Sequence, residues 1–162
     1  MSVVIRDAQV TDRAFISQTW VTSFRSSQDT GPVPVEIYFD TFRKVIADLL
    51  ARPAVKVLVA VDSELPPPHE IHGYLVFEPG PHRKGTQMLP KPAVHFCYVK
   101  ELHRRQGVAR SLFREAGIDP AHPFFFTFRT PDARAVLKER RWQGEYHPNI
   151  VKYTKQSKEM TA

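Results

Sequence analysis

The spacing of apolar positions divides the chain into strands and helices. Dense runs of β-branched and aromatic residues predict strands, whereas apolar residues that recur every three or four positions predict helices. Strands are expected at 3–8, 55–61, 71–78, 93–99, 124–128 and 149–153, and helices at 11–26, 36–51, 107–116 and 130–142. The predicted order is β-α-α-β-β-β-α-β-α-β, with neither an internal repeat nor a linker between domains.

Proline, glycine and polar residues mark the connections between these elements. The segment 27–34 is typical of a loop, and 62–68 contains three consecutive prolines, which exclude a central strand there. The long basic connection 79–92 indicates either a mobile hairpin or a substrate loop. Residues 144–148 are expected to form a turn, and 156–162 a polar, frayed tail.

The stretch 93–117 has the strongest chemical signal. A buried strand, a basic connection and a helix that starts at Gly107 follow one another. The first turn of a helix leaves backbone N–H groups unsatisfied, and a glycine lets a ligand approach them closely. Arg104, Arg105 and Arg110 add positive charge, so the turn favours a phosphate or a pyrophosphate. The alternative is an ordinary strand-to-helix loop with a solvated basic face, because the Walker pattern and the three-glycine dinucleotide fingerprint are both absent.

Composition limits the possible classes of protein. A chain of 162 residues with 42% hydrophobic content indicates one domain with one core. No apolar run has the length of a membrane span, and the N-terminus lacks the apolar region of a signal peptide. Because Cys97 is the single cysteine, a cytoplasmic location is expected, and no zinc site or other metal site is predicted. The net charge of +6 suits nucleic acid or a cofactor with several phosphates.

The residues Arg104-Arg105-Gln106-Gly107-Val108-Ala109 resemble the Arg/Gln-x-x-Gly-x-Gly/Ala motif of the GCN5-related N-acetyltransferases (GNATs). The order of elements over roughly 3–153 also resembles that family. The resemblance implies an α/β (α+β) GNAT fold over 1–155. It consists of a mixed central sheet of six to seven strands, with splayed central strands and about four flanking helices. The implied cofactor is acetyl-CoA, bound as the acyl donor.

The resemblance also implies where this cofactor lies. Its pantetheine arm would occupy the gap between strands 93–99 and 124–128, hydrogen-bonded to the backbone of Tyr98 and Val99. The amide of Val99 would donate to the thioester carbonyl, and the motif would hold the pyrophosphate. The expected cofactor-binding residues are Tyr98, Val99, Arg104, Arg105, Gln106, Gly107, Val108, Ala109, Arg110 and Thr130.

The implied reaction is direct attack of a neutral amine on the thioester, which needs a base. His95 is either this base or a core histidine with satisfied partners, and strand alternation predicts that it shares a face with Cys97 and Val99. Cys97 is expected to be a small buried residue rather than a nucleophile. The family's usual tyrosine proton donor is missing, since Leu137, or Lys138 with a shift of one residue, stands in its place.

Tyr146 either reaches the sulfur as a substitute for that donor or packs on the sheet. The predicted function is an acyl-CoA-dependent N-acetyltransferase that acts on a small-molecule or protein amine through a ternary complex. Two alternatives are a basic nucleic-acid-associated protein and a GNAT-fold module that binds acyl-CoA with reduced catalysis. Weak contact with nucleic acid, no membrane partner, and a monomer or homodimer are expected.

Overall fold

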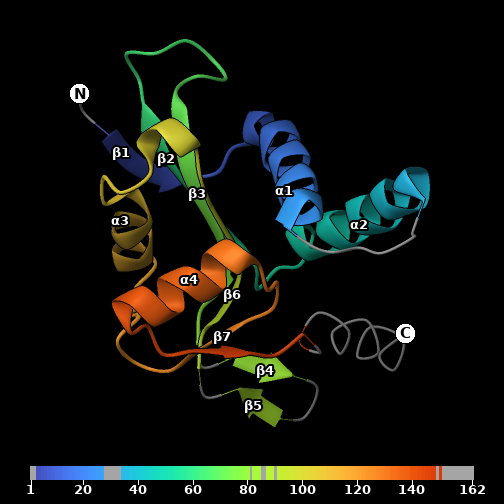
Figure 1. Cartoon of the computed structure of the whole chain (residues 1–162), viewed down its shortest axis with the longest axis vertical. Coiled ribbons are helices and arrows are strands. Elements are labelled where there is room, and N and C mark those ends of the chain that lie inside the picture. The colour runs from blue at the N-terminus through green and yellow to red at the C-terminus, as the bar shows by residue number, and fades with distance from the viewer. Residues whose placement is uncertain are drawn as a thin grey trace.

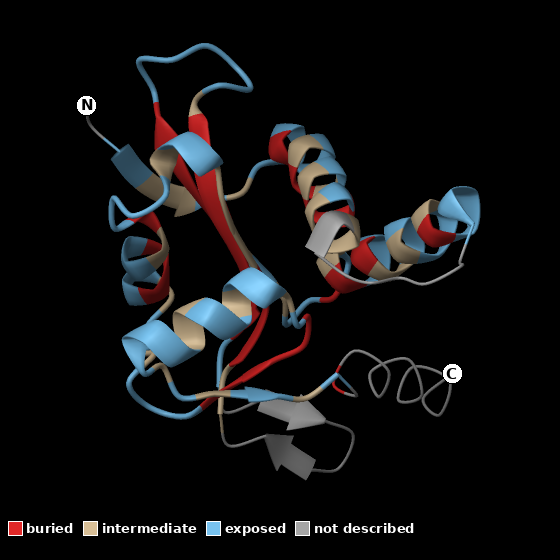
Figure 2. Cartoon of the chain, viewed as in Figure 1, coloured by how far each residue is buried: buried red, intermediate tan, exposed pale blue. Residues whose placement is uncertain are grey.

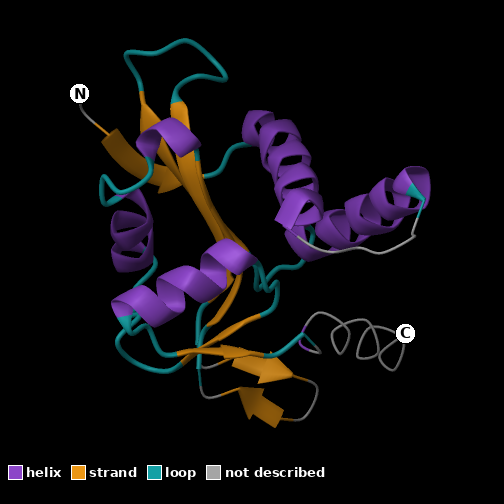
Figure 3. Cartoon of the chain, in the orientation of Figure 1, coloured by secondary structure: helices purple, strands orange, loops and turns teal. Residues whose placement is uncertain are grey.

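A six-stranded mixed sheet forms the centre of the computed structural model, which describes residues 3–27, 34–80, 82–84, 87–89, 91–148 and 150. Its strands follow the order β1 (Val3–Asp7), β2 (Lys56–Asp62), β3 (Ile71–Glu78), β6 (Ala93–Val99), β7 (Phe124–Phe126) and β8 (Gly144–Tyr146). The first three pairings are antiparallel and the last two are parallel. The long connection contains a separate two-stranded ribbon of β4 (His82–Lys84) and β5 (Gln87–Leu89) (Figure 3).

Four α-helices flank the sheet (Figure 1). They are α1 (Arg13–Ser27), α2 (Val35–Leu50), α3 (Val108–Glu115) and α4 (Pro131–Arg140), and two 3-10 turns, η1 (Val10–Asp12) and η2 (Glu101–His103), precede α1 and α3. The number of strands and helices confirms the expected fold class. None of the helices in the described segments is long and apolar enough to cross a bilayer.

Apolar side chains bury both faces of the sheet, and they form two main clusters. One cluster joins α1 and α2 to one face, with Trp20 stacked on Phe96 at 5.1 Å between ring centroids. The other cluster joins α3 to the opposite face, around Leu75, Leu112 and Phe113. The strands between these helices are therefore mostly buried, and the outward faces of the helices are exposed (Figure 2).

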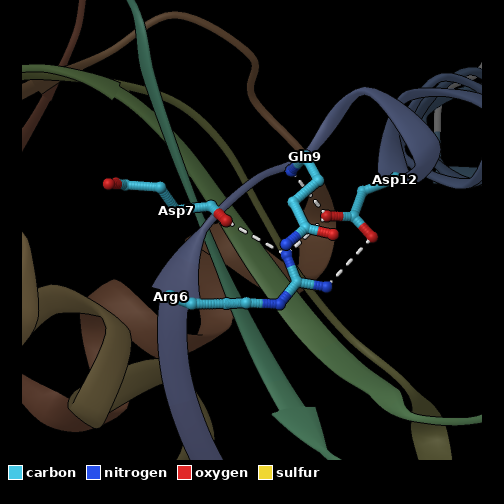
Figure 4. A network of polar contacts seen from close by, with 4 residues as sticks. All are labelled: Arg6, Asp7, Gln9 and Asp12. Atoms are coloured by element: carbon cyan, nitrogen blue, oxygen red, sulfur yellow. Dashed lines mark hydrogen bonds and ion pairs between the residues drawn. The ribbon is translucent and has the colours of Figure 1, made fainter.

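A buried carboxylate organises the entry to α1. Arg6 donates two hydrogen bonds to Asp12, at 2.6 and 3.2 Å, and the Gln9 backbone N–H donates a third at 2.7 Å (Figure 4). Burial alone would raise the pKa of Asp12, but these hydrogen bonds outweigh it and hold the pKa below its ordinary value. Thr11, the expected start of this helix, lies instead in the 3-10 turn that Asp12 stabilises.

The end of the sheet differs from the prediction. Residues 144–146 form β8, where a turn was expected. The glycine there serves close packing rather than a turn, because a Cβ atom on Gly144 would lie 2.7 Å from Leu137 Cδ2. Of the strand expected at 149–153, only Ile150 is described, and it is helical. The polar tail at 156–162 lies outside the described residues.

Candidate active site

The central strands β6 and β7 separate soon after they meet. They pair in parallel only at Ala93 with Phe125 and at Val94 with Phe126, and the last backbone hydrogen bond between them runs from Thr127 N–H to the Val94 carbonyl (3.1 Å). Beyond this point a cleft of about 600 Å³ opens, with walls from β6, the loop before α3, the strand β7 and the helix α4. The strands thus diverge where the pantetheine arm was expected.

The turn that opens α3 leaves its backbone N–H groups without a side-chain cap. Gly107 is the N-cap of α3, with φ 82° and ψ 9°, and a Cβ atom there would meet nothing within 4 Å. Arg105 also has a positive φ of 63°, a conformation that is uncommon outside glycine and concentrates at ligand sites. The Gln106 side chain donates to the Leu102 carbonyl at 3.3 Å and does not cap the N–H groups of the turn. An anion therefore has open access to the turn.

Most of the expected cofactor residues lie together around this cleft. Those that line it are Tyr98, Val99, Arg104, Arg105, Gly107, Val108, Ala109 and Thr130. Arg104 spans the mouth, because its Nε donates to the Val99 carbonyl (3.1 Å) and its Nη1 lies 3.8 Å from Asp132 of α4. Thr130 caps α4 by accepting from the Ala133 N–H, as its sequence position predicted. Gln106 and Arg110 do not line this cleft.

The backbone direction of β6 distinguishes between its two expected donors, Tyr98 and Val99. The Lys100 N–H donates to the His72 carbonyl of β3 at 2.9 Å. Because backbone groups along a strand point alternately to its two edges, the Tyr98 N–H also points toward β3, whereas those of Cys97 and Val99 point toward the cleft. The Cys97 and Val99 N–H groups are therefore the better placed donors of β6, and the expected contact through the Tyr98 backbone stays a prediction.

A bulge at His95 overturns the predicted facing of β6. Phe96 pairs with Val76 and Val94 pairs with Phe77, which leaves His95 without a pairing residue in β3. Val94 consequently packs in the same cluster as Cys97 and Val99, although simple alternation would place it on the opposite face. The rule that grouped His95 with Cys97 and Val99 does not hold across the bulge.

His95 lies at the root of the cleft within a buried polar array. Its Nδ1 is hydrogen-bonded to Thr127 Oγ1 at 2.8 Å, and its Nε2 lies 3.4 Å from Glu78 Oε1. The same carboxylate oxygen lies 3.9 Å from Arg52 Nη1, and all four side chains are buried. Sequence reasoning missed Arg52, Glu78 and Thr127, because an acid at the end of an apolar strand is usually exposed and no local pattern pairs these positions.

No tyrosine from α4 faces the cleft. Leu137 lines it, whereas the neighbouring Lys138 does not, which favours Leu137 as the residue in place of the missing tyrosine. Tyr146 lies on β8 with 41% of its surface exposed, and its ring packs against Phe126 and beneath Arg129, outside the cleft lining. This placement favours the packing role over contact with the thioester sulfur. Burial raises the pKa of the Cys97 thiol to about 12, so the thiol stays protonated.

Solved structures share this fold. A candidate acetyl transferase from Pyrococcus furiosus gives a TM-score of 0.58 at 16% identity, over 96% of this chain and 91% of its own. A protein described as a predicted acetyltransferase with acetyl-CoA, from Clostridium acetobutylicum, gives 0.55 at 15% identity, over 88% and 90%. An aminoglycoside antibiotic 6'-N-acetyltransferase from Acinetobacter haemolyticus gives 0.51 at 18% identity, over 86% and 90%.

These likenesses establish the fold, which is that of the GNAT acetyltransferases. No model of a protein family matches the sequence, and no curated protein does.

Proposed function

We propose that this chain is an N-acetyltransferase that transfers an acetyl or other acyl group from coenzyme A to an amine. The observation that carries the proposal is that two suitable binding features line the same cleft. An uncapped turn at Gly107 can hold a diphosphate, and the gap between β6 and β7 can take an extended arm. The Clostridium acetobutylicum protein with the same fold, described with acetyl-CoA, supports this choice of donor.

In the proposed complex, the diphosphate accepts hydrogen bonds from the N–H groups of 107–109, beside Arg104 and Arg105. The Val99 N–H points into the gap and donates to the thioester carbonyl oxygen, where negative charge grows as the amine attacks. Donors that are fixed before the substrate binds stabilise such charge effectively. The cleft is thus suited to a direct transfer in one ternary complex.

The proposed step forms a bond from the amine nitrogen to the thioester carbon and then breaks the bond from that carbon to sulfur, releasing coenzyme A as its thiolate. Cys97 takes no covalent part, because its thiol remains protonated. His95 receives the proton of the attacking amine, directly or through water, and the Glu78 carboxylate stabilises the resulting imidazolium. The proton then passes from the imidazolium to the coenzyme A thiolate, which restores the neutral imidazole and leaves coenzyme A as the free thiol. The reducing cytoplasm remains the proposed location.

A titration with acetyl-CoA tests the proposal. At 100 times the dissociation constant, binding should add about 2.7 kcal/mol of stability, seen as a rise in melting temperature. A panel of amines should then release free coenzyme A. An unchanged melting temperature at millimolar acetyl-CoA would contradict the proposal. Binding without release from any amine would instead favour a module that binds acyl-CoA and does not catalyse transfer.

A further inference from the structure

A second cavity, of about 450 Å³, lies between α3 and the end of α4. Its wall includes Arg110 and Arg114 of α3, the loop 117–121, and Arg140 and Trp142 at the end of α4. The last two residues also line the cofactor cleft, so the two spaces share a wall. The cavity and the cleft are therefore immediate neighbours.

The cavity is strongly cationic. Across the described segments, no acidic side chain forms an ion pair with any of its three arginines. Its one carboxylate, Asp119, already accepts hydrogen bonds from the Ala121 N–H and from His122, each at 3.0 Å. The Arg140 guanidinium lies 5.7 Å from the centre of the Trp142 ring, which restrains it at the shared wall. Several guanidinium groups in one cavity favour a phosphate, which accepts paired hydrogen bonds from them.

Helix α3 connects this cavity to the proposed diphosphate site. At 1.5 Å per residue, Arg110 and Arg114 lie about 4.5 and about 10.5 Å beyond Gly107 along the helix axis. In the proposed complex the diphosphate lies at Gly107 and the thioester lies in the gap between β6 and β7, so the opposite end of the donor has these arginines of α3 within reach. In coenzyme A, that end is an adenosine whose 3'-phosphate carries up to two negative charges.

We infer that this arginine cavity (Arg110, Arg114 and Arg140) binds the 3'-phosphate of coenzyme A. The inference rests on the proposed function and narrows its donor. The acyl group arrives on free coenzyme A, and not on the phosphopantetheine arm of a carrier protein, which has no adenosine and no 3'-phosphate. Arg110 keeps its expected contact with the cofactor, but at this phosphate instead of the pyrophosphate.

Calorimetric titrations with coenzyme A and with 3'-dephospho-coenzyme A test the inference. The unmodified protein should bind coenzyme A at least about tenfold more tightly than the dephospho form, which corresponds to about 1.4 kcal/mol of binding free energy. In Arg114→Gln and Arg140→Gln the ratio of the two affinities should fall toward one, while the affinity for the dephospho form changes little. Arg134→Gln, on the exposed part of α4 outside both cavities, removes the same charge and should keep the full ratio.

The outcomes separate the two proposals. Equal affinity for the two ligands in the unmodified protein would overturn the inference and leave the proposed function standing. A ratio that survives both substitutions would overturn the assignment to these arginines. If neither coenzyme A nor the dephospho form bound, the proposed function and the inference would both be overturned. Adenosine 3',5'-bisphosphate should compete with coenzyme A, and this competition should weaken in Arg114→Gln.

Discussion

His95 Nδ1 lies 2.8 Å from Thr127 Oγ1, at the point where β6 and β7 stop pairing. The last backbone hydrogen bond of the pair uses the Thr127 N–H, and the side-chain bond follows it immediately. Both side chains are buried, so water does not replace this bond. The bond therefore fixes the root of the cleft, and it couples the candidate base to the geometry of the gap between the strands.

Replacing Thr127 should show how much the hydrogen bond to His95 contributes to the free energy of unfolding. Thr127→Val leaves His95 Nδ1 buried without its hydroxyl partner, which should cost about 1–3 kcal/mol. Thr127→Ser keeps the hydroxyl and loses a methyl group, for a cost of roughly 0.8 kcal/mol. Urea denaturation measures both values. Equal losses in the two variants would show that the hydrogen bond contributes nothing beyond packing.

The role of His95 as base should appear in the pH dependence of turnover. An imidazole loses its ability to accept a proton once it is protonated, so kcat/KM should fall on the acidic side. His95→Gln should lower turnover by about 10²- to 10⁴-fold and remove this acidic limb. Affinity for acetyl-CoA, measured separately, should remain. Full turnover of His95→Gln between pH 5 and 9 would assign His95 a purely structural role.

The sequence predicted those parts of the site that depend on local signals. The uncapped turn at Gly107 and the Thr130 cap follow from residue types at fixed offsets, and both are present. The array of Arg52, Glu78, His95 and Thr127 could not be found in this way, since its members come together only through the register of β3, β6 and β7. The bulge at His95 depends on the same tertiary pairing.

Two glycines that flank α3 allow a matched test of the diphosphate site. Gly107 and Gly117 both have positive φ, 82° and 72°, and both face open space. A leucine at either position should cost about 1–2 kcal/mol of stability. Only Gly107→Leu should also weaken binding of dephospho-coenzyme A, by about tenfold or more, because its side chain enters the turn. Dephospho-coenzyme A is used because it lacks the 3'-phosphate, so a change at Gly117, which borders the arginine cavity, should not affect its binding. Similar affinities in the two variants would place the diphosphate elsewhere.

The buried Asp12 predicts a loss of stability in acid. Its pKa is lowered in the folded protein, so its contribution is complete above its unfolded value of about 3.9 and disappears as the pH falls through the lower folded value. Asp12→Asn should therefore be less stable at pH 7 by about 1.5–3 kcal/mol, the range for hydrogen bonds to charged groups. The difference should narrow below about pH 4. A constant difference from pH 7 to pH 3 would contradict this account.

Arg141 occupies a backbone conformation that is unfavourable for a residue with a side chain. It ends α4 in the left-handed conformation, with φ 54° and ψ 38°, where glycine is preferred. Arg141→Gly should raise stability by about 1 kcal/mol, or roughly 2–4 °C in melting temperature. Arg134→Gly places the same change in the middle of α4 and should lower stability by about 1 kcal/mol. If both variants lost stability, the side chain of Arg141 would have to supply contacts that outweigh its backbone strain.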